Sequence, residues 1–558
     1  MQDTRWLVML AVLLWGCTGS TTPGGPTATD VSSTTTTTLT GTTTSSTPRT
    51  TTPVDESSEL RMGTMIPVDS LDPADALTFS DWEILQAVNE GLLRREPGDG
   101  ELVPGIAEDL PEVSDDGLTY TFRLRPEVTF ADGTRLTAPM YVASIERVMR
   151  LGGRSSDLVS LFVSSVDAPD DTTVVFHLRD RFAFFPTLVA NAAYSPIHPD
   201  SYPDDELVAF PEAPIYGVGP WSLVDYSESE IVLEPNPEYY GDPVTPNRIV
   251  IRTFETPEEM ANALVGEHID FAWRGVDTQA ATSLSETEDV SVEVVPGGTL
   301  HFVTVNHGLA PTDNPVVRRA IAQLVDRETI LEKVLGGAFV PAFSPVPPGY
   351  AGSSDSFLES YGGPNITEAI DLLEGAGYTE TNRAEIELAY PPERFGPEIA
   401  AAMEELELQI ESSGLVEVTL TSQPWNTYVG DVIEGTYHLA FLGWLHDFPD
   451  TYNYLAPFVL AGGVGGSGEN LENPEIVDVL TEAGMTFDET ERSRLYGEVQ
   501  SLFAEDVVTI PLWIEHPYVA YRDSVVANSQ FDNPQSLNIG TTLLLDFRSI
   551  DVDSGENE

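Results

Sequence analysis

The chain has 558 residues, and 41% of them are hydrophobic, which is enough to bury several sizeable cores. It carries 90 acidic residues against 26 Lys and Arg, so its formal net charge is −64. This balance argues against nucleic-acid binding, which needs clustered cations, and against adsorption to anionic lipid. Lys333 is the only lysine. The composition fits either a saline or high-GC lineage or an ordinary acidic secreted protein.

The N-terminus has the pattern of a bacterial signal peptide. Residues 6–14 form an apolar run after Arg5, and this run is too short to cross a bilayer of about 30 Å as a helix. Leu14-Trp15-Gly16-Cys17 resembles the lipobox of bacterial lipoproteins, although Trp15 replaces the usual small residue. We therefore expect lipidation at Cys17 and a signal peptide over residues 1–17. The alternative is a free buried cysteine in an uncleaved signal.

Cys17 is the only cysteine, so disulfides within the chain and CxxC zinc sites are excluded. Residues 18–58 consist mainly of Thr, Ser, Pro and Gly, a composition that cannot form a core and predicts a disordered linker. A lipid anchor followed by a long linker implies a globular domain held at the outer face of a membrane. No later apolar run is long enough to span a bilayer.

Apolar β-branched runs alternate with amphipathic stretches from residue 59 onward, which predicts an α/β fold. The expected strands are residues 119–124, 173–178, 230–233 and 248–253. The expected helices are residues 81–93, 315–335, 367–375 (with Thr367 as the cap), 397–412 and 489–503.

Motifs for catalysis or cofactor binding do not stand out. Residues 463–468 match GxGxxG, but two acids and a proline follow them where a dinucleotide site needs a helix, so we predict a flexible loop. Asp115 and Asp116 precede Gly117 and are most simply a turn. The eight histidines are scattered. We expect no enzyme activity, no cofactor and no metal.

A series of segments resembles the family 5 extracellular solute-binding proteins, which include the dipeptide- and oligopeptide-binding components of ABC importers. The segments follow the family's order between about residues 60 and 521. They are SLDP at 70–73, NEGLL at 89–93, VPGIAE at 103–108, DGLTYTFRLR at 116–125, VTFADG at 128–133, GVGPW at 217–221, NPEYY at 236–240, GEHID at 266–270, VRRA with VDR at 317–327, AIDLLEGAGY at 369–378, and GW with DFPD at 443–450.

The resemblance implies a two-lobed periplasmic-binding-protein fold of type II, with two crossovers joining the lobes and the ligand buried between them. The solute-binding domain would span residues 59–547. Lobe I would comprise residues 59–95, 215–297 and 518–547, the extra subdomain residues 96–214, and lobe II residues 298–517. Residues 548–558 would form an acidic tail. The partners implied are a peptide or other small solute and ABC permease subunits, and we expect a monomer.

The same resemblance implies the ligand-binding residues. Asp447, in the motif that begins at Gly443, would receive the α-ammonium group of a peptide; the alternative is a helix cap or turn. Trp425 and Trp444 would be flat pocket walls, unless they belong to the core. Gly443 would let the ligand backbone approach closely. Trp513 is a further candidate for the pocket. Met65 and Ile66 stand where some oligopeptide binders carry a second acid.

These observations favour a lipid-anchored receptor that delivers peptides to an ABC permease. A receptor for another solute, such as an oligosaccharide, an opine or a chelated metal, stays open because aromatic walls suit these ligands too. A secreted hydrolase is the third hypothesis, and the missing nucleophile–base pattern speaks against it.

Overall fold

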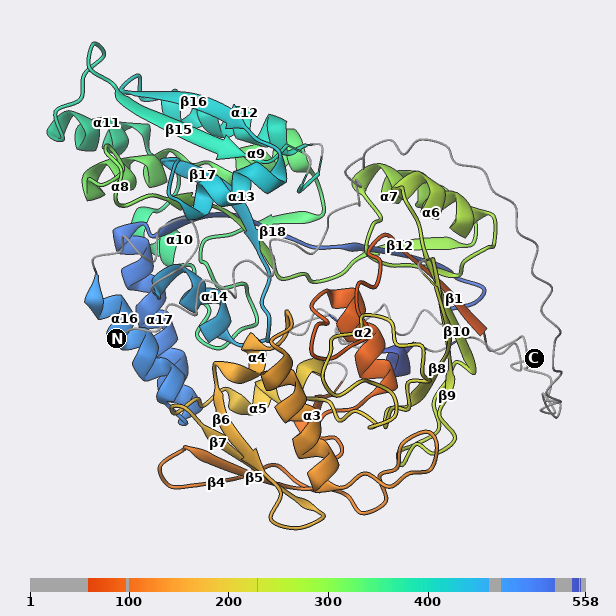
Figure 1. Cartoon of the computed structure of the whole chain (residues 1–558). Coiled ribbons are helices and arrows are strands. Elements are labelled where there is room, and N and C mark those ends of the chain that lie inside the picture. Colours follow the sequence, from red (N-terminus) through yellow and green to blue (C-terminus); the bar gives the residue numbers. More distant parts are fainter. Residues whose placement is uncertain are drawn as a thin grey trace, which may run out of the picture.

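The computed structural model describes residues 59–96, 100–227, 229–392, 394–396, 398–460, 473–526, 544–550 and 552. The predicted signal peptide, Cys17, the linker, the 463–468 loop and most of the acidic tail lie outside the described residues. Within them, helices and strands alternate around separate sheets (Figure 1), which confirms the α/β class.

One sheet, on the right in Figure 1, gathers strands from both ends of the chain. β1 runs parallel to its neighbours β10 and β11, and the other pairs are antiparallel. The order is β12 (Val290–Val294), β19 (Tyr518–Arg522), β11 (Phe271–Ala272), β1 (Glu59–Thr64), β10 (Arg248–Thr253), β9 (Glu230–Pro235) and β8 (Trp221–Tyr226). These strands belong to the segments predicted as lobe I.

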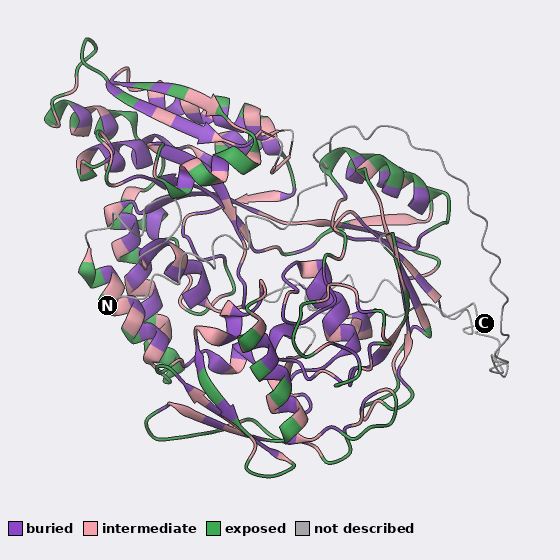
Figure 2. Cartoon of the chain, viewed as in Figure 1, coloured by how far each residue is buried: buried purple, intermediate pink, exposed green. Residues whose placement is uncertain are grey.

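Three helices accompany this sheet: α2 (Phe79–Val88), α6 (Pro257–Val265) and α7 (Thr278–Leu284). α6 buries Met260, Ala263 and Leu264 and exposes its opposite face (Figure 2). This one-sided burial is the pattern of a helix that covers a sheet.

The second sheet, at the upper left in Figure 1, lies within the predicted lobe II. Its order is β14 (Phe339–Pro341), β18 (Thr509–Glu515), β13 (Thr299–Val305), β17 (Leu439–Trp444), β15 (Ala384–Tyr390) and β16 (Val416–Ser422). The accompanying helices are α8 (Pro315–Leu324), α9 (Arg327–Ile330), the π-helical turn η3 (Leu331–Leu335), α10 (Ser356–Tyr361), α11 (Ile366–Gly375), α12 (Ile399–Glu411), α13 (Trp425–Ile433), α14 (Thr451–Val459), α16 (Pro474–Met485) and α17 (Glu489–Asp506).

Two short connections join these sheets. Residues 295–298 link β12 to β13, and residues 516–517 link β18 to β19. The connections lie side by side, because the Val295 amide donates to the Pro517 carbonyl at 3.0 Å. A Cβ atom added to Gly297 would overlap the Glu515 carbonyl oxygen. This is the arrangement of a two-crossover hinge.

The segment predicted as the extra subdomain lies in the lower part of Figure 1. It contains β3 (Leu102–Pro104), which pairs with β2 (Leu93–Arg95) at the end of the predicted lobe I segment. It also contains the sheet of β4 (Glu112–Val113), β5 (Thr119–Arg123), β7 (Thr173–Leu178) and β6 (Val163–Asp167), and the helices α3 (Ala138–Leu151), α4 (Asp157–Ser160), α5 (Phe185–Leu188) and η2 (Ala192–Tyr194).

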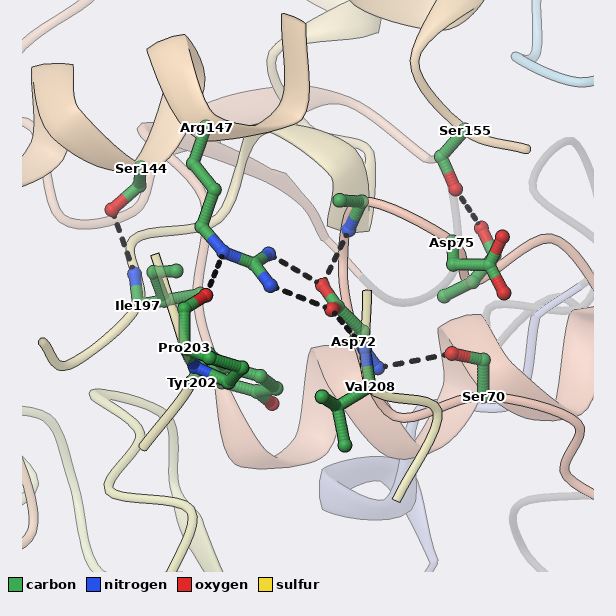
Figure 3. A network of polar contacts seen from close by, with 12 residues as sticks. Ser70, Asp72, Asp75, Ser144, Arg147, Ser155, Ile197, Tyr202, Pro203 and Val208 are labelled. Carbon is green, nitrogen blue, oxygen red and sulfur yellow. Dashed lines mark hydrogen bonds and ion pairs between the residues drawn. The ribbon is translucent and has the colours of Figure 1, made fainter. Parts of the chain in front are cut away.

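A buried ion pair fastens the extra subdomain to the chain after β1. Arg147 on α3 donates through both terminal nitrogens to Asp72, at 2.8 Å each (Figure 3). The amides of Ala74 and Val208 also donate to the Asp72 carboxylate, at 3.0 and 3.2 Å. Neither charged side chain is more than 3% exposed. The SLDP motif is thus a structural junction between lobe I and the extra subdomain.

Aromatic contacts connect the extra subdomain to lobe II as well. The Phe184 ring stacks on Tyr452 and Phe448, with centroids 4.7 and 5.2 Å apart. Beside them, the Ala183 amide donates to the Gly484 carbonyl at 2.9 Å. One continuous hydrophobic core therefore runs from the extra subdomain into lobe II, and it includes part of the predicted lobe I segment, such as Trp82 and Leu85 on α2. Two further cores contain residues of the lobe I sheet.

The expected strands appear within two residues of their predicted ends, but two helices differ. The helix predicted over 81–93 ends at Val88, because Asn89 adopts extended backbone and Leu93 already begins β2. The helix predicted over 315–335 breaks after Leu324. Asp326 caps a new helix there, since its carboxylate accepts from the Thr329 amide at 3.0 Å.

Smaller corrections concern the helix ends. The cap of α11 is Asn365 and not Thr367, because the Asn365 side chain accepts from the Glu368 amide at 3.1 Å. The helix predicted over 397–412 is α12, and α17 extends beyond the predicted 489–503. The turn at 115–117 is confirmed: Asp116 Oδ1 accepts from the Leu118 amide at 3.1 Å, and Gly117 has a φ of +70°.

The proposed bounds of the lobes, the extra subdomain and the tail stay predictions. The described chain is still packed beyond Phe547, since Ile550 is fully buried. The short helix η7 (Phe547–Ser549) lies at this point.

Candidate ligand-binding site

A cavity of about 80 Å³ lies where lobe I, the extra subdomain and lobe II meet. Lobe I contributes α2, the residues after it, and Trp221. The extra subdomain contributes Thr187, Ala190, Asn191 and Ser195. Lobe II contributes His446, Asp447 and Pro449, and the C-terminal stretch 544–548 closes one side. Of the residues predicted to bind ligand, Asp447 is the one that lines this cavity.

Asp447 is held in place by one asparagine. Its amide donates to Asn453 Oδ1 at 2.8 Å, and Asn453 Nδ2 donates to Asp447 Oδ2 at 3.3 Å. Asn191 Nδ2, from the extra subdomain, reaches the Asp447 carbonyl at 3.4 Å. The other carboxylate oxygen, Oδ1, has no hydrogen-bond partner among the described residues.

Burial makes this carboxylate unusual. Asp447 is 3% exposed. Burial raises its pKa to about 7, and the hydrogen bond from Asn453 opposes this only in part. A buried carboxylate with a free oxygen can gain much from a cationic hydrogen-bond donor. The cap of the following helix α14 is Asp450, which accepts from the Tyr452 amide at 2.8 Å, so Asp447 does not cap this helix.

The wall contributed by lobe I also holds buried polar atoms without partners. Both polar side-chain atoms of Asn89 and the indole nitrogen of Trp221 have no hydrogen-bond partner among the described residues. Each residue is 1% exposed. Unpartnered buried polar groups are uncommon in folded proteins and often mark functional sites.

Charged residues in the cavity wall form two networks around α2. Glu90 accepts from the Tyr240 hydroxyl at 2.5 Å and lies 3.4 Å from both Arg548 and Arg94. Burial raises the pKa of Glu90, against the opposing effects of these partners. Arg548 also pairs with Asp546 at 2.6 Å. These contacts fix the C-terminal stretch against lobe I.

The second network begins at Glu83, which pairs with Arg274 at 2.8 Å and accepts from the Leu545 amide at 3.1 Å.

Arg95 differs from the other arginines of the cavity in its hydrogen-bond partners. It donates to the Gly100 carbonyl at 2.6 Å and, at longer distances, to Thr187 and Pro449. Burial lowers the pKa of its guanidinium.

Three other predicted residues gather in an aromatic cluster at the crossover end of the lobe II sheet. His301 on β13 pairs with Gly443 on one side and Trp513 on the other. Its ring stacks on Trp513 with centroids 5.8 Å apart. Phe395 links His301 to Trp425 through edge-to-face contacts. Trp513 is fully buried, and its indole nitrogen has no partner among the described residues.

Trp444 lies elsewhere. As the neighbour of Gly443 on β17, its side chain points to the opposite face of the sheet. There it is 4% exposed, contacts Phe458 and donates to the Asn453 carbonyl at 3.1 Å. Trp444 thus supports the asparagine that holds Asp447. The roles predicted for Trp425, Gly443, Trp444 and Trp513 stay predictions.

Sequence reasoning missed several residues of the site. Asn89 and Trp221 lie inside motifs quoted for the resemblance, yet nothing in those motifs singles them out. Arg394 carries a terminal nitrogen without a partner among the described residues, and its guanidinium lies 4.7 Å from the Trp425 ring centre. Asn453 and the 544–548 stretch carry no motif at all.

No helix in the described part of the chain is both long and apolar enough to cross a membrane. Among the same residues, no group of three His, Cys, Asp or Glu side chains is placed to hold a metal ion.

Comparison with known proteins identifies the family. The model for bacterial extracellular solute-binding proteins, family 5, matches residues 101–466. The oligopeptide-binding protein OppA of Bacillus subtilis strain 168 is 26% identical over 475 residues, which cover 80% of this chain and 85% of OppA.

Solved structures share the fold. DppA from Helicobacter pylori, in complex with the peptide STSA, has a TM-score of 0.69 at 22% identity over 88% of this chain and 97% of its own. NikA from Brucella suis, in complex with Fe(III)-EDTA, has a TM-score of 0.74 at 19% identity over 89% of this chain and all of its own. The predicted two-lobed fold is therefore confirmed.

Proposed function

Since the chain belongs to the bacterial extracellular solute-binding proteins of family 5, we propose that it captures peptides between its lobes and hands them to an ABC permease. Family members are solute-binding receptors and not enzymes, and the homologues act outside the cytoplasm. We propose further that a lipid on Cys17 holds the receptor at the membrane. The linker of residues 18–58 would let the binding domain move away from the membrane surface. The lipobox-like sequence supports the anchor.

The unpartnered oxygen of Asp447 carries the peptide proposal. An ammonium group placed there would meet a desolvated carboxylate that Asn453 has already oriented. Such an ion pair stabilises the complex when it is well hydrogen-bonded, whereas an empty site leaves the carboxylate without compensation. This difference selects ligands with a free amino terminus.

The aromatic cluster supports a second element of the proposal. β15 pairs with β17 only at Leu439 and Ala440, so the end of β17 that holds Gly443 lacks a partner on this side among the described strands. The Phe395 ring packs over Gly443 and against Trp425, whereas Trp513 is fully buried. A peptide backbone that binds along this end of the strand gains affinity through main-chain hydrogen bonds whatever its side chains are. Loosely filled side-chain pockets would then hold water.

The alternative is the same receptor role for a solute that is not a peptide. The NikA structure in complex with Fe(III)-EDTA shows that this fold also holds a metal chelate. An oligosaccharide or opine would fit the aromatic cluster equally well. A sugar or a metal chelate carries no ammonium group, so Asp447 would then have no cationic partner in the ligand.

Competition separates the two functions. Purified protein, freed of carried-over ligand by unfolding and refolding, is titrated calorimetrically with a pool of short peptides and with the same pool after N-terminal acetylation. Peptide capture predicts binding of the free pool and loss of binding after acetylation. Binding of a sugar or a metal chelate, with neither peptide pool competing, would transfer the assignment to the alternative.

A further inference from the structure

The lobe I side of the cavity beside Asp447 holds buried polar groups without partners. Asn89 Nδ2 and Trp221 Nε1 are donors and Asn89 Oδ1 is an acceptor, and none of the three has a hydrogen-bond partner among the described residues. Arg95 lines the same cavity. Filling this space with a purely apolar group would leave the buried donors unpaired, which weakens binding.

Arg95 also differs from the neighbouring arginines in its ion pairing. Arg94 and Arg548 each lie within 3.4 Å of a carboxylate. Among the described residues, Arg95 forms no ion pair, and its donors reach carbonyl and hydroxyl oxygens only. A cation held in this way can take an anionic partner without breaking an existing salt bridge.

Charged residues of both signs line the cavity. Among the described residues they are the carboxylates of Glu83, Glu90, Asp447 and Asp546 and the guanidinium groups of Arg94, Arg95 and Arg548. Salt bridges hold Glu83 to Arg274, Arg94 to Glu96 and Arg548 to Asp546. Arg95 is thus the one guanidinium group in the described lining that has no carboxylate within salt-bridge distance.

We propose that this cavity receives the side chain of the ligand residue whose ammonium group pairs with Asp447, and that it selects an acidic side chain. Arg95, Asn89 and Trp221 supply the donors for its carboxylate, so the preferred ligands are peptides that begin with Glu or Asp. The inference rests on the proposed peptide-binding function and adds a side-chain preference to it. Water in the cavity, with no preference for any side chain, is the competing outcome.

Three peptides of nearly equal size test the proposal: Glu-Ala-Ala, Gln-Ala-Ala and Leu-Ala-Ala, titrated calorimetrically into the full chain. We expect the Kd to rise from the first to the third, with Glu-Ala-Ala at least about tenfold tighter than Leu-Ala-Ala. Arg95→Gln should bring Glu-Ala-Ala to the affinity of Gln-Ala-Ala and leave Leu-Ala-Ala unchanged. Arg150→Gln, on the outer face of α3, is the control and should change none of the three.

Trp221→Phe keeps the ring and removes the donor, and it serves as a second variant should Arg95→Gln fold poorly. It should weaken Glu-Ala-Ala and Gln-Ala-Ala but not Leu-Ala-Ala. Equal Kd values for the three peptides, tighter binding of Leu-Ala-Ala, or an equal loss for all three in Arg95→Gln would overturn the preference and leave peptide capture intact. Failure of every peptide to bind would overturn both proposals.

Discussion

Asp447 and Asn453 form a reciprocal pair: the Asp447 amide donates to the Asn453 side chain at 2.8 Å, and the Asn453 side chain donates back to the Asp447 carboxylate at 3.3 Å. The Trp444 indole donates to the Asn453 backbone carbonyl at 3.1 Å. The carboxylate is thus oriented by one residue, buried, and left with one oxygen free.

The first prediction concerns the charge of Asp447. Asp447→Asn keeps the size of the side chain and removes the partner of an ammonium group. We expect peptide affinity to fall by at least about 100-fold, because a desolvated ion pair is lost. Isothermal titration calorimetry with a tripeptide that has a free amino terminus measures this loss of affinity. Asp450→Asn removes a charge three residues away while keeping a residue that caps helices well, and it should change affinity by less than about threefold.

The second prediction concerns stability and pH. A carboxyl whose folded pKa is raised from 3.8 to about 7 binds its proton more tightly in the folded state. Its contribution to stability is therefore full below the unfolded pKa and is lost as the pH rises through the folded value. We expect the ligand-free protein to lose up to about 4 kcal/mol from this group between about pH 4 and pH 8.

The Asp447→Asn variant isolates this effect. In urea unfolding without ligand, it should be more stable than the parent at about pH 8, and the difference should shrink at about pH 5. A variant less stable than the parent at both pH values would mean that Asp447 is a structural residue.

The third prediction concerns the hinge. Gly297→Ala places a methyl group against the Glu515 carbonyl on the neighbouring crossover. We expect about 1–3 kcal/mol of destabilisation, together with weaker peptide binding, because the two crossovers must move apart. Gly337→Ala is the matched control, since its new Cβ would have nothing closer than 4.0 Å. Equal behaviour of the two variants would contradict the account of the crossovers.

The fourth prediction concerns the junction in Figure 3. Arg147→Met leaves Asp72 buried without its ion partner, and we expect the free energy of unfolding to fall by about 3–5 kcal/mol. Arg150 lies about one turn further along α3 and forms an exposed ion pair with Asp204. Arg150→Met should therefore lower the free energy of unfolding by less than about 1 kcal/mol. Denaturant titration of both variants measures the difference. A small loss for Arg147→Met would mean that the junction is not what fastens the extra subdomain.

The sequence predicted best those features that depend on the spacing of nearby apolar residues. Strand positions followed from alternating apolar residues, and the α/β class followed from their succession. The helix over 315–335 was wrong because hydrophobic spacing continues smoothly through Val325, whereas the break depends on Asp326 capping a new helix. Side-chain capping competes with helix continuation, and periodicity does not register that competition.

The site was predictable only in part, for a different reason. Asp447 lies in a motif, so the sequence located it. Its unpartnered oxygen and its raised pKa depend on Asn453, Asn191 and the burial that several segments create together. Asn89 and Trp221 meet Asp447 because the lobes are brought together by two crossovers, and this proximity has no signal in the chain order. The alternation of side chains along β17, by contrast, already separates Trp444 from the face of Gly443.

The most direct test of the central claim is the melting temperature of the ligand-free chain and of its Asp447→Asn variant, each with a free peptide pool and with the same pool acetylated. A ligand at about 100 times its Kd adds about 2.7 kcal/mol of stability, which is a visible shift. Peptide capture predicts a shift for the parent with the free pool alone and none for the variant. Equal shifts with both pools, or an equal shift in the variant, would contradict the assignment of Asp447 as the ammonium site.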